Sequence, residues 1–190
     1  MQKKRNTEKI RGWFRVSGGS VSPASKLGSG VELRKALSRI KRSIWVFHIN
    51  TGSCNGCDIE ILDVLTPYFD VERFGIKLVV SPRHADLALL TGPVTIKTFS
   101  KVYRALSAMP RPRFVLAIGS CAVGGNIWFE SYSTLGGFPK ALEKFSEMGL
   151  EIDGVVYVPG CPARPEAIIY GAATLLGLQK PKVKYKRFKA

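Results

Sequence analysis

Four cysteines carry the side chains in this sequence that are best suited to metal or redox chemistry. Cys54 and Cys57 lie within TGSCNGCDIE, whereas Cys121 and Cys161 stand alone, separated from the preceding cysteine by 63 and 39 residues. Thiolates bind zinc and iron–sulfur clusters, and a Cys-x-x-Cys pair also cycles between dithiol and disulfide. The first question is therefore whether all four cysteines serve one site or only the close pair does.

The spacing of the cysteines favours an iron–sulfur cluster over zinc. Structural zinc sites usually draw on two close pairs of ligands, but this sequence has one pair and two single cysteines. Single ligands from separate loops suit a cubane, because each iron corner takes its own thiolate. Glycine lets the backbone approach a bulky group, and Pro162 follows the last cysteine. The flanking glycines are Gly52, Gly56, Gly119, Gly124, Gly125 and Gly160.

Three other interpretations stay open at this point. Free cysteines are often only small, buried apolar side chains. A thiol–disulfide oxidoreductase would use Cys54 and Cys57 between a strand and a helix, but would leave Cys121 and Cys161 without a role. A zinc-bearing scaffold protein is the third alternative.

Hydrophobic patterning predicts the elements that position these cysteines. Continuous apolar runs are typical of parallel strands buried on both faces, and helical stretches between them predict an α/β, doubly wound parallel sheet. Each cysteine segment follows a predicted strand, and in a parallel sheet those strand ends share one edge. The predicted strands are 43–50, 76–80, 85–90, 114–119 and 155–159, and the predicted helices are 59–69, 98–109, 139–149 and 165–178.

Basic residues are concentrated towards the two ends of the chain. The 190 residues carry a net charge of +15, of which residues 1–43 hold +10 and residues 180–190 hold +6. We predict a basic, partly helical N-terminal extension (1–42), one iron–sulfur domain (43–178) and a basic tail (179–190). Within the extension, a Gly- and Ser-rich linker (17–30) precedes a basic amphipathic helix (31–42).

The composition also restricts where the protein works. No apolar run approaches the roughly 18 residues of a transmembrane helix, and the basic N-terminus lacks the apolar core of a secretory signal. Basic segments of this kind suit an anionic membrane surface or an acidic partner. No nucleic-acid-binding motif accompanies them, so we expect no nucleic acid partner. We expect a peripheral protein on the cytoplasmic side of the cell membrane.

Four segments in order, CNGCDIEIL, SPRHADLALLTGPVT, AIGSCAVGG and PGCPARPEAI, resemble the small electron-transfer subunit shared by [NiFe] hydrogenases and respiratory complex I. The likeness runs from about residue 43 to residue 178. The Cys-x-x-Cys form of the first motif is similar to hydrogenase small subunits, especially the membrane-bound, energy-converting group. The corresponding motif of complex I has two adjacent cysteines instead.

The resemblance implies a flavodoxin-like fold with one [4Fe–4S] cluster at the carboxyl edge of the sheet. The metal ligands would be Cys54, Cys57, Cys121 and Cys161, and the cofactor-binding surroundings would include Gly52, Gly56, Gly119, Gly160 and Pro162.

In that family role the chain has no catalytic residue. It would relay electrons between a ferredoxin-like iron–sulfur subunit and the active site of a large hydrogenase-like subunit, in an ion-translocating complex with membrane subunits. Related complexes use such a subunit for sulfane or quinone reduction. The terminal electron acceptor belongs to another chain and is left open here.

Other polar residues of these motifs have two interpretations each. Asp58 and Glu60 follow Cys57, where a carboxylate either favours a helix N-terminus or moves protons near the cluster. His48 is expected to be a packed strand side chain. By the resemblance, Arg83 and His84 face the large subunit. The Gly- and aromatic-rich stretch 124–138 is expected to cover the cluster or to contact a partner.

Overall fold

The computed structural model describes residues 20–22 and 43–175 of the chain. The predicted amphipathic helix at 31–42, the basic tail at 179–190 and most of the predicted linker at 17–30 lie outside these residues. Within the linker, Ser20–Ser22 form a short strand, β1, that pairs antiparallel with β6 at the edge of the sheet.

The described strands form one sheet with the order β1-β6-β5-β4-β2-β3. All pairs except β1 with β6 are parallel. Numbered along the chain, the five parallel strands have the order 2-1-3-4-5, one of the two common orders of doubly wound sheets. The predicted α/β class with a parallel sheet is therefore confirmed. The parallel strands are β2 (Ile44–Asn50), β3 (Ile76–Leu78), β4 (Leu87–Thr91), β5 (Phe114–Ile118) and β6 (Gly154–Val158).

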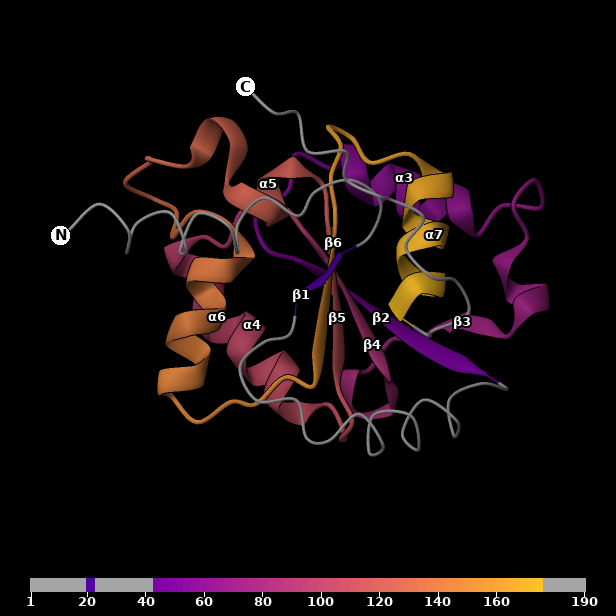
Figure 1. Ribbon diagram of the computed structural model, residues 1–190, viewed down its shortest axis with the longest axis horizontal. Coiled ribbons are helices and arrows are strands. Elements are labelled where there is room, and N and C mark those ends of the chain that lie inside the picture. Colours follow the sequence, from indigo (N-terminus) through magenta and orange to yellow (C-terminus); the bar gives the residue numbers. More distant parts are fainter. Residues whose placement is uncertain (1–19, 23–42, 176–190) are drawn as a thin grey trace, which may run out of the picture.

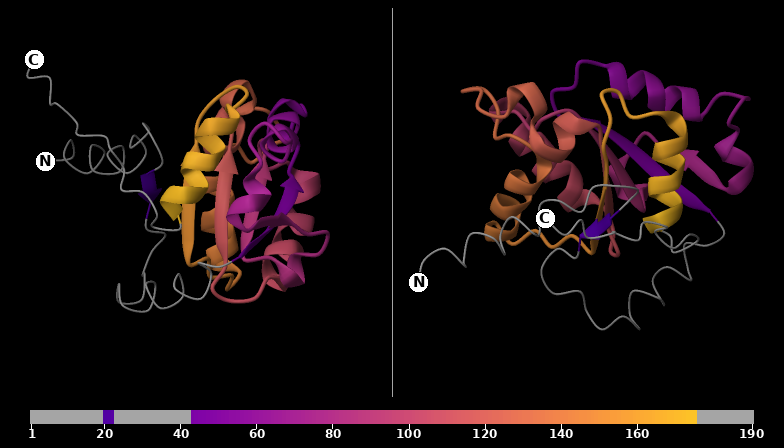
Figure 2. Two further views of the ribbon diagram at one scale, coloured as in Figure 1. Left: turned by 90° about the vertical axis from the view of Figure 1, so that its right-hand side faces the viewer. Right: turned by 45° about the horizontal axis from the view of Figure 1, so that its top comes forward.

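Helices cover both faces of this sheet (Figures 1 and 2). The helices α3 (Gly56–Val64) and α7 (Pro165–Leu175) pack on one face, and α4 (Ile96–Ala108) and α6 (Phe138–Glu147) pack on the other. The other short elements are α5 (Ser120–Gly124) and the 3-10 turns η1 (Val71–Phe74), η2 (Pro82–His84) and η3 (Asn126–Trp128).

The central strand β5 illustrates why continuous apolar runs predicted this fold. Successive side chains of a strand point to opposite faces. Leu116 accordingly packs with the α3/α7 layer, whereas Val115 packs with the α4/α6 layer, and both are fully buried. A strand with a core on each face needs an apolar residue at every position, which is the sequence pattern of a buried parallel strand.

The register of the sheet aligns the strand ends. Asn50 of β2 lies beside Thr91 of β4, Thr91 lies beside Ile118 of β5, and Ile118 lies beside Val158 of β6. Four strands therefore end at one level, and the segments that follow them leave the sheet along the same edge.

Helix starts differ from the sequence prediction at this edge. Helix α3 begins at Gly56, three residues before its predicted start at 59, and α5 was not predicted because five residues show no helical periodicity. Asn55 precedes α3 in the left-handed conformation, with φ of 69°. Cys57 and Cys121 consequently lie in the first turns of helices rather than in open loops.

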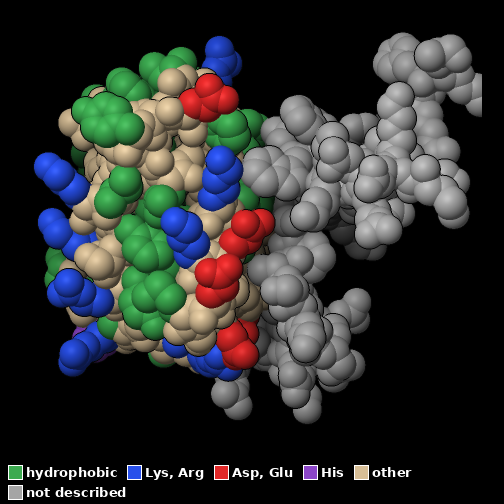
Figure 3. Space-filling view, turned by 90° about the vertical axis from the view of Figure 1, so that its left-hand side faces the viewer, with side chains coloured by type: hydrophobic (Ala, Val, Ile, Leu, Met, Phe, Trp, Pro, Cys, Tyr) green, Lys and Arg blue, Asp and Glu red, His purple; other side chains and the backbone are tan. Residues whose placement is uncertain are grey.

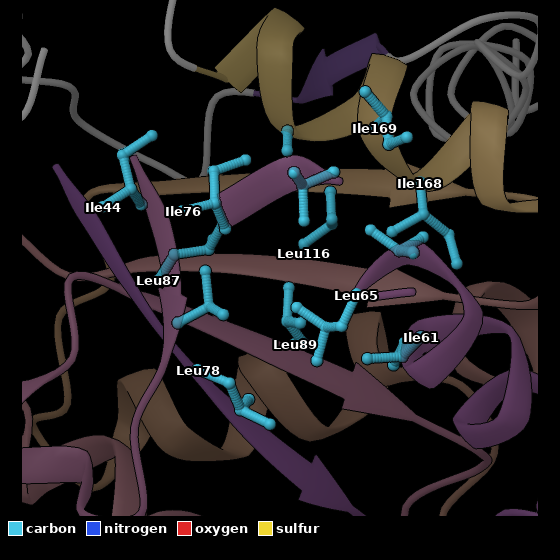
Figure 4. A pocket seen from close by; sticks show the side chains of 14 residues that line it. Ile44, Ile61, Leu65, Ile76, Leu78, Leu87, Leu89, Leu116, Ile168 and Ile169 are labelled. Carbon is cyan, nitrogen blue, oxygen red and sulfur yellow. The ribbon is translucent and has the colours of Figure 1, made fainter. Parts of the chain in front are cut away.

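The described residues also contain an apolar cavity between the sheet and the α3/α7 layer. Its volume is about 30 Å³, and its lining side chains, such as Leu89, Ile61 and Ile168, are all apolar (Figure 4). It is a packing gap in the core and supplies no polar group for chemistry. Among residues 20–22 and 43–175, no helix is both long enough and apolar enough to cross a bilayer.

Candidate functional site

All four cysteines lie at the carboxyl edge of the sheet, where the predicted strand ends located them. Cys54 lies in the turn after β2, and Cys57 lies in the first turn of α3. Cys121 lies in α5, and Cys161 lies in the turn between β6 and α7. These segments come together at the top of Figure 1 and in both views of Figure 2. Cys54 and Cys161 are exposed, Cys57 and Cys121 are half-buried, and all four are free thiols.

Backbone hydrogen bonds join the segments of Cys121 and Cys161. Ser120 N donates to Gly160 O at 2.7 Å, and Gly160 N donates to Ser120 Oγ at 3.3 Å. One residue further back, Gly119 N donates to Val158 O at 2.8 Å, which continues the pairing of β5 with β6. The two cysteines are therefore held side by side although 40 positions separate them.

Two predicted glycines bring the Cys-x-x-Cys segment against the other two segments. A Cβ on Gly119 would lie 2.5 Å from Cys57 Sγ, so only a residue without a side chain fits there. A Cβ on Gly56 would lie 3.6 Å from Cys54 Sγ and 3.7 Å from Pro162 Cβ. These close approaches connect the first cysteine segment to both of the others.

The other two predicted glycines make tight turns rather than contacts with sulfur. Gly52 and Gly160 have φ of 131° and 147°. A Cβ would lie 2.6 Å from Thr95 Cγ2 at Gly52 and 2.5 Å from Ala163 Cα at Gly160. They shape the segments that carry Cys54 and Cys161.

The four thiols influence one another electrostatically. Burial, the largest cause, raises the pKa of Cys57, and the charges of Cys121 and Cys54 raise it further. Burial also raises the pKa of Cys121, a hydrogen bond from Asn126 lowers it, and the charges of Cys161 and Cys54 raise it. These couplings link all four cysteines. Because metal ligands must be thiolates, metal binding at this edge would release protons.

The donor set agrees with a cubane in the type and number of its ligands. Among the described residues, no three His, Cys, Asp or Glu side chains converge closely enough to hold a single metal ion. Four neighbouring thiols on three segments instead suit a cluster in which each iron takes one thiolate. The assignment of the four cysteines as ligands stays a prediction at this stage.

Asp58, which follows Cys57, is the centre of a side-chain network. Its Oδ1 accepts hydrogen bonds from Thr91 Oγ1 at 2.8 Å and Asn50 Nδ2 at 3.3 Å. The same oxygen lies 2.6 Å from His48 Nε2. Its Oδ2 accepts a short hydrogen bond from Ser53 Oγ. The carboxylate therefore ties the start of α3 to β2 and β4.

The turn that carries Cys54 is part of this network. Asn50 Oδ1 accepts hydrogen bonds from the backbone N–H groups of Gly52 and Ser53, both at 3.0 Å. Ser53 Oγ accepts a third from Asn55 N at 2.9 Å. Side chains on both ends of the turn thus hold its backbone in place.

His48 differs from the expectation of a packed core side chain. It lies in β2 beneath α3, but 29% of its side chain is exposed and its Nε2 contacts Asp58 and Thr91 Oγ1. The apolar residues around it in the sequence suggested a core position. His48 has polar partners because Asp58, in the first turn of α3, points toward β2 and brings its carboxylate to His48 Nε2.

Arg83 and His84 lie at the opposite edge of the sheet. They belong to η2, which precedes β4, and the ring of His84 lies edge-on to Trp45 with 6.3 Å between ring centroids. Trp45 is the second residue of β2, so this is the amino edge, away from the cysteines. Glu60 lies on α3 and is half-buried.

The loop after α5 presents an apolar surface beside the cysteines. Ile127 and Tyr132 are 80% and 96% exposed, and Trp128 and Phe129 are 46% and 39% exposed. Figure 3 shows hydrophobic side chains gathered at the top of the face that includes this loop. We refer to residues 127–132 as the apolar loop.

Asn126 is the residue of this edge that sequence reasoning missed. Its Nδ2 lies 3.8 Å from Cys121 Sγ and 3.7 Å from Cys161 Sγ. A usable signal was present in Gly-Gly-Asn at residues 124–126, which starts three residues after Cys121, because glycine and asparagine both tolerate the left-handed conformation. Such a reversal directs the next side chain back toward the cysteine.

Known proteins resemble this chain across the segments that carry the four cysteines. Residues 54–175, which include all four cysteines, match the family described as NADH ubiquinone oxidoreductase, 20 Kd subunit. The probable membrane-bound hydrogenase subunit mbhJ of Pyrococcus furiosus is 50% identical over 141 residues, which cover 74% of this chain and 77% of that protein.

Two further relatives extend the comparison. Formate hydrogenlyase subunit 7 of Escherichia coli is 44% identical over 147 residues, which cover 77% of this chain but only 54% of that protein. Among solved structures, a chain of the membrane-bound sulfane sulfur reductase, an archaeal respiratory membrane complex, is similar with a TM-score of 0.60 and 36% identity. That match covers 75% of this chain and 73% of the other. The chain therefore belongs to the family of NADH ubiquinone oxidoreductase 20 kDa subunits and related hydrogenase subunits.

Proposed function

We propose that this chain is the electron-transfer subunit of a membrane-bound, ion-translocating hydrogenase-type complex. One [4Fe–4S] cluster, bound by Cys54, Cys57, Cys121 and Cys161, relays electrons to or from the active site of a large subunit. The observation that carries this proposal is the meeting of four thiols, from three segments distant in sequence, at one edge of a parallel sheet. The 50% identity to a probable membrane-bound hydrogenase subunit supports this type of complex.

The chain's own residues supply the binding and the surroundings of the cluster. A [4Fe–4S] cluster supplies one-electron transfer. Gly119 leaves the space into which Cys57 Sγ fits, and Asn126 directs an amide at two sulfurs. Cys57 and Cys121 are half-buried on the core side, whereas Cys54 and Cys161 are exposed. A cluster held in this way lies close to the surface, as transfer to another subunit requires.

We further propose three partners: a large hydrogenase-like subunit, a ferredoxin-like iron–sulfur subunit, and membrane subunits on the cytoplasmic side of the membrane. The apolar loop supports a protein contact beside the cysteines, because exposed apolar patches mark interaction surfaces. The names of the P. furiosus and sulfane-reducing relatives support membrane association. The basic segments 1–42 and 179–190 suit contact with an anionic surface.

Electron transfer in a sulfane sulfur reductase is a second candidate within the same class. A chain of the solved complex of that name is 36% identical to this one. The two candidates differ in the large subunit rather than in this chain. Two intact Cys-x-x-Cys pairs in the companion large subunit indicate a nickel site, and their loss indicates sulfur compounds or quinone as the acceptor.

A thiol–disulfide oxidoreductase at Cys54 and Cys57 agrees less well with the geometry. That activity would give no role to Cys121 and Cys161, which lie beside the pair.

Anaerobic reconstitution followed by metal analysis tests the proposal. We expect about four iron and four sulfide ions per chain, and an electron paramagnetic resonance (EPR) signal after chemical reduction. Cys121→Ala should lose the cluster. A thiol–disulfide activity at Cys54 and Cys57, in contrast, should survive this substitution. Ser146→Ala, on the exposed side of α6, is the control. Wild-type protein without iron, or full iron content in Cys121→Ala, would contradict the proposal.

A further inference from the structure

We propose that Asn126 bridges the sulfurs of Cys121 and Cys161 and thereby raises the reduction potential of the cluster that they bind. This inference rests on the proposed function. One amide nitrogen lies 3.8 Å from the first sulfur and 3.7 Å from the second. The two sulfurs come from different segments, so a single side chain contacts half of the proposed ligand set.

The backbone after α5 explains how the amide reaches both sulfurs. Gly125 and Asn126 are both left-handed, with φ of 88° and 47°. Gly125 N donates to Cys121 O at 2.8 Å and closes the short helix. Two consecutive left-handed residues reverse the chain, so the side chain of residue 126 returns to the start of α5. Asparagine tolerates this conformation better than most residues, and unlike glycine it also provides a donor.

The chemical effect of the amide follows from its direction. An N–H group stabilises sulfur more strongly when the sulfur carries more negative charge, and the amide of Asn126 lies within hydrogen-bond distance of both sulfurs. A reduced cluster carries one more negative charge than an oxidised one. The donor therefore stabilises the reduced state more, and hydrogen bonds to ligand sulfurs are a known determinant of cluster potential.

Asn126 lies at the surface, directly before the apolar loop. The residue is exposed, and it lies between the two sulfurs and the apolar loop that begins at Ile127. Asn126 is thus an exposed residue whose side chain contacts two of the sulfurs.

Asn55 provides a matched comparison within the same edge. It is also left-handed, with φ of 69°, and it lies between Cys54 and Cys57 in the sequence. Its side-chain oxygen accepts a long hydrogen bond of 3.5 Å from Asn50 Nδ2. Replacing Asn55 by glycine therefore changes the same residue type, in the same conformation, next to proposed ligands but without removing a donor to sulfur.

Redox titration of the reconstituted full-length chain, followed by EPR, tests the inference. Asn126→Gly keeps the turn and removes the donor, whereas Asn126→Asp keeps the size and replaces the donor with a carboxylate. We expect the midpoint potential to fall from wild type to Asn126→Gly and further to Asn126→Asp. Iron content should be unchanged in Asn126→Gly, and Asn55→Gly should retain the wild-type potential.

Three results would overturn the inference. A wild-type potential in both Asn126 variants shows that the amide does not act on the cluster. Partial loss of iron with an unchanged potential in the remaining protein shows a merely structural role. Complete loss of the cluster in Asn126→Gly shows that the amide is needed for binding rather than for setting the potential. Absence of a cluster in the wild type would instead contradict the proposed function, so the two failures are distinguishable.

Discussion

The two halves of the cysteine edge are built differently. The half with Cys54 and Cys57 is held by side chains, because Asp58 and Asn50 together accept or donate hydrogen bonds that join α3, β2 and β4. The half with Cys121 and Cys161 is held mainly by backbone hydrogen bonds, from Ser120 N to Gly160 O and from Gly119 N to Val158 O, and it continues into the exposed apolar loop.

This difference suggests a division of roles. A side-chain network with several hydrogen bonds to one carboxylate favours a single geometry, so we expect the Cys-x-x-Cys half to be arranged before any cluster is bound. The other half has one exposed amide over its sulfurs and an apolar surface beside it. Under the proposed function, it is the half that a partner subunit and the cluster would complete.

The largest effect is expected where the two halves touch. A Cβ at Gly119 would lie 2.5 Å from Cys57 Sγ, and φ there is +91°. Gly119→Ala should lower the free energy of unfolding by about 1–3 kcal/mol, as expected for a strained backbone, and should reduce iron content after reconstitution. Chemical denaturation and iron analysis measure both. Gly124→Ala is the control, because a Cβ there meets no atom within 4 Å. Equal behaviour of the two variants would show that close contact between the halves is not required.

A smaller effect is expected on the free energy of unfolding, which should depend more on the Cys54/Cys57 half than on the Cys121/Cys161 half. Asp58→Ala leaves several donors without their acceptor and should lower the free energy of unfolding of the metal-free chain by about 2 kcal/mol. Asn126→Gly in the other half should change it by less than about 0.5 kcal/mol, because the residue is exposed and its φ suits glycine. Asp63→Ala on the exposed side of α3 is the control for removing a carboxylate. Thermal unfolding would refute the division of roles if Asn126→Gly were as destabilising as Asp58→Ala.

The smallest effect is expected on the pH dependence of the free energy of unfolding, through the half-buried thiol of Cys57. Burial raises the pKa of Cys57 above its ordinary value of 9.0, so the folded metal-free chain holds this proton more tightly than the unfolded chain. The resulting stabilisation is fully present below about pH 9 and is lost as pH rises through the folded pKa. Cys57→Ala should therefore lose less stability than wild type between about pH 8 and about pH 11. The measurement is the free energy of unfolding of both proteins as a function of pH. An equal dependence on pH in the two proteins would contradict the expectation.

The sequence alone determined the layout of the edge. Runs such as FVLAI at 114–118 have an apolar residue at every position, as a strand with a core on both faces requires. Parallel strands end on one edge, so the location of Cys54, Cys121 and Cys161 followed from local pattern and topology. The glycines beside them followed in the same way, because tight turns and close approaches leave little choice of residue.

Only the tertiary structure decided which side chains meet at that edge. Thr91 and Asp58 are 33 positions apart, and Asn126 and Cys161 are 35 apart. Neither pair has a signal in local periodicity, because contact depends on the register of neighbouring strands and on the direction in which each first helical turn leaves the sheet. His48 therefore looked like a core residue in the sequence and proved to be a partner of Asp58 in the fold. Periodicity reports which face a residue occupies, whereas a hydrogen bond depends on distances of a few tenths of an ångström, which packing alone sets.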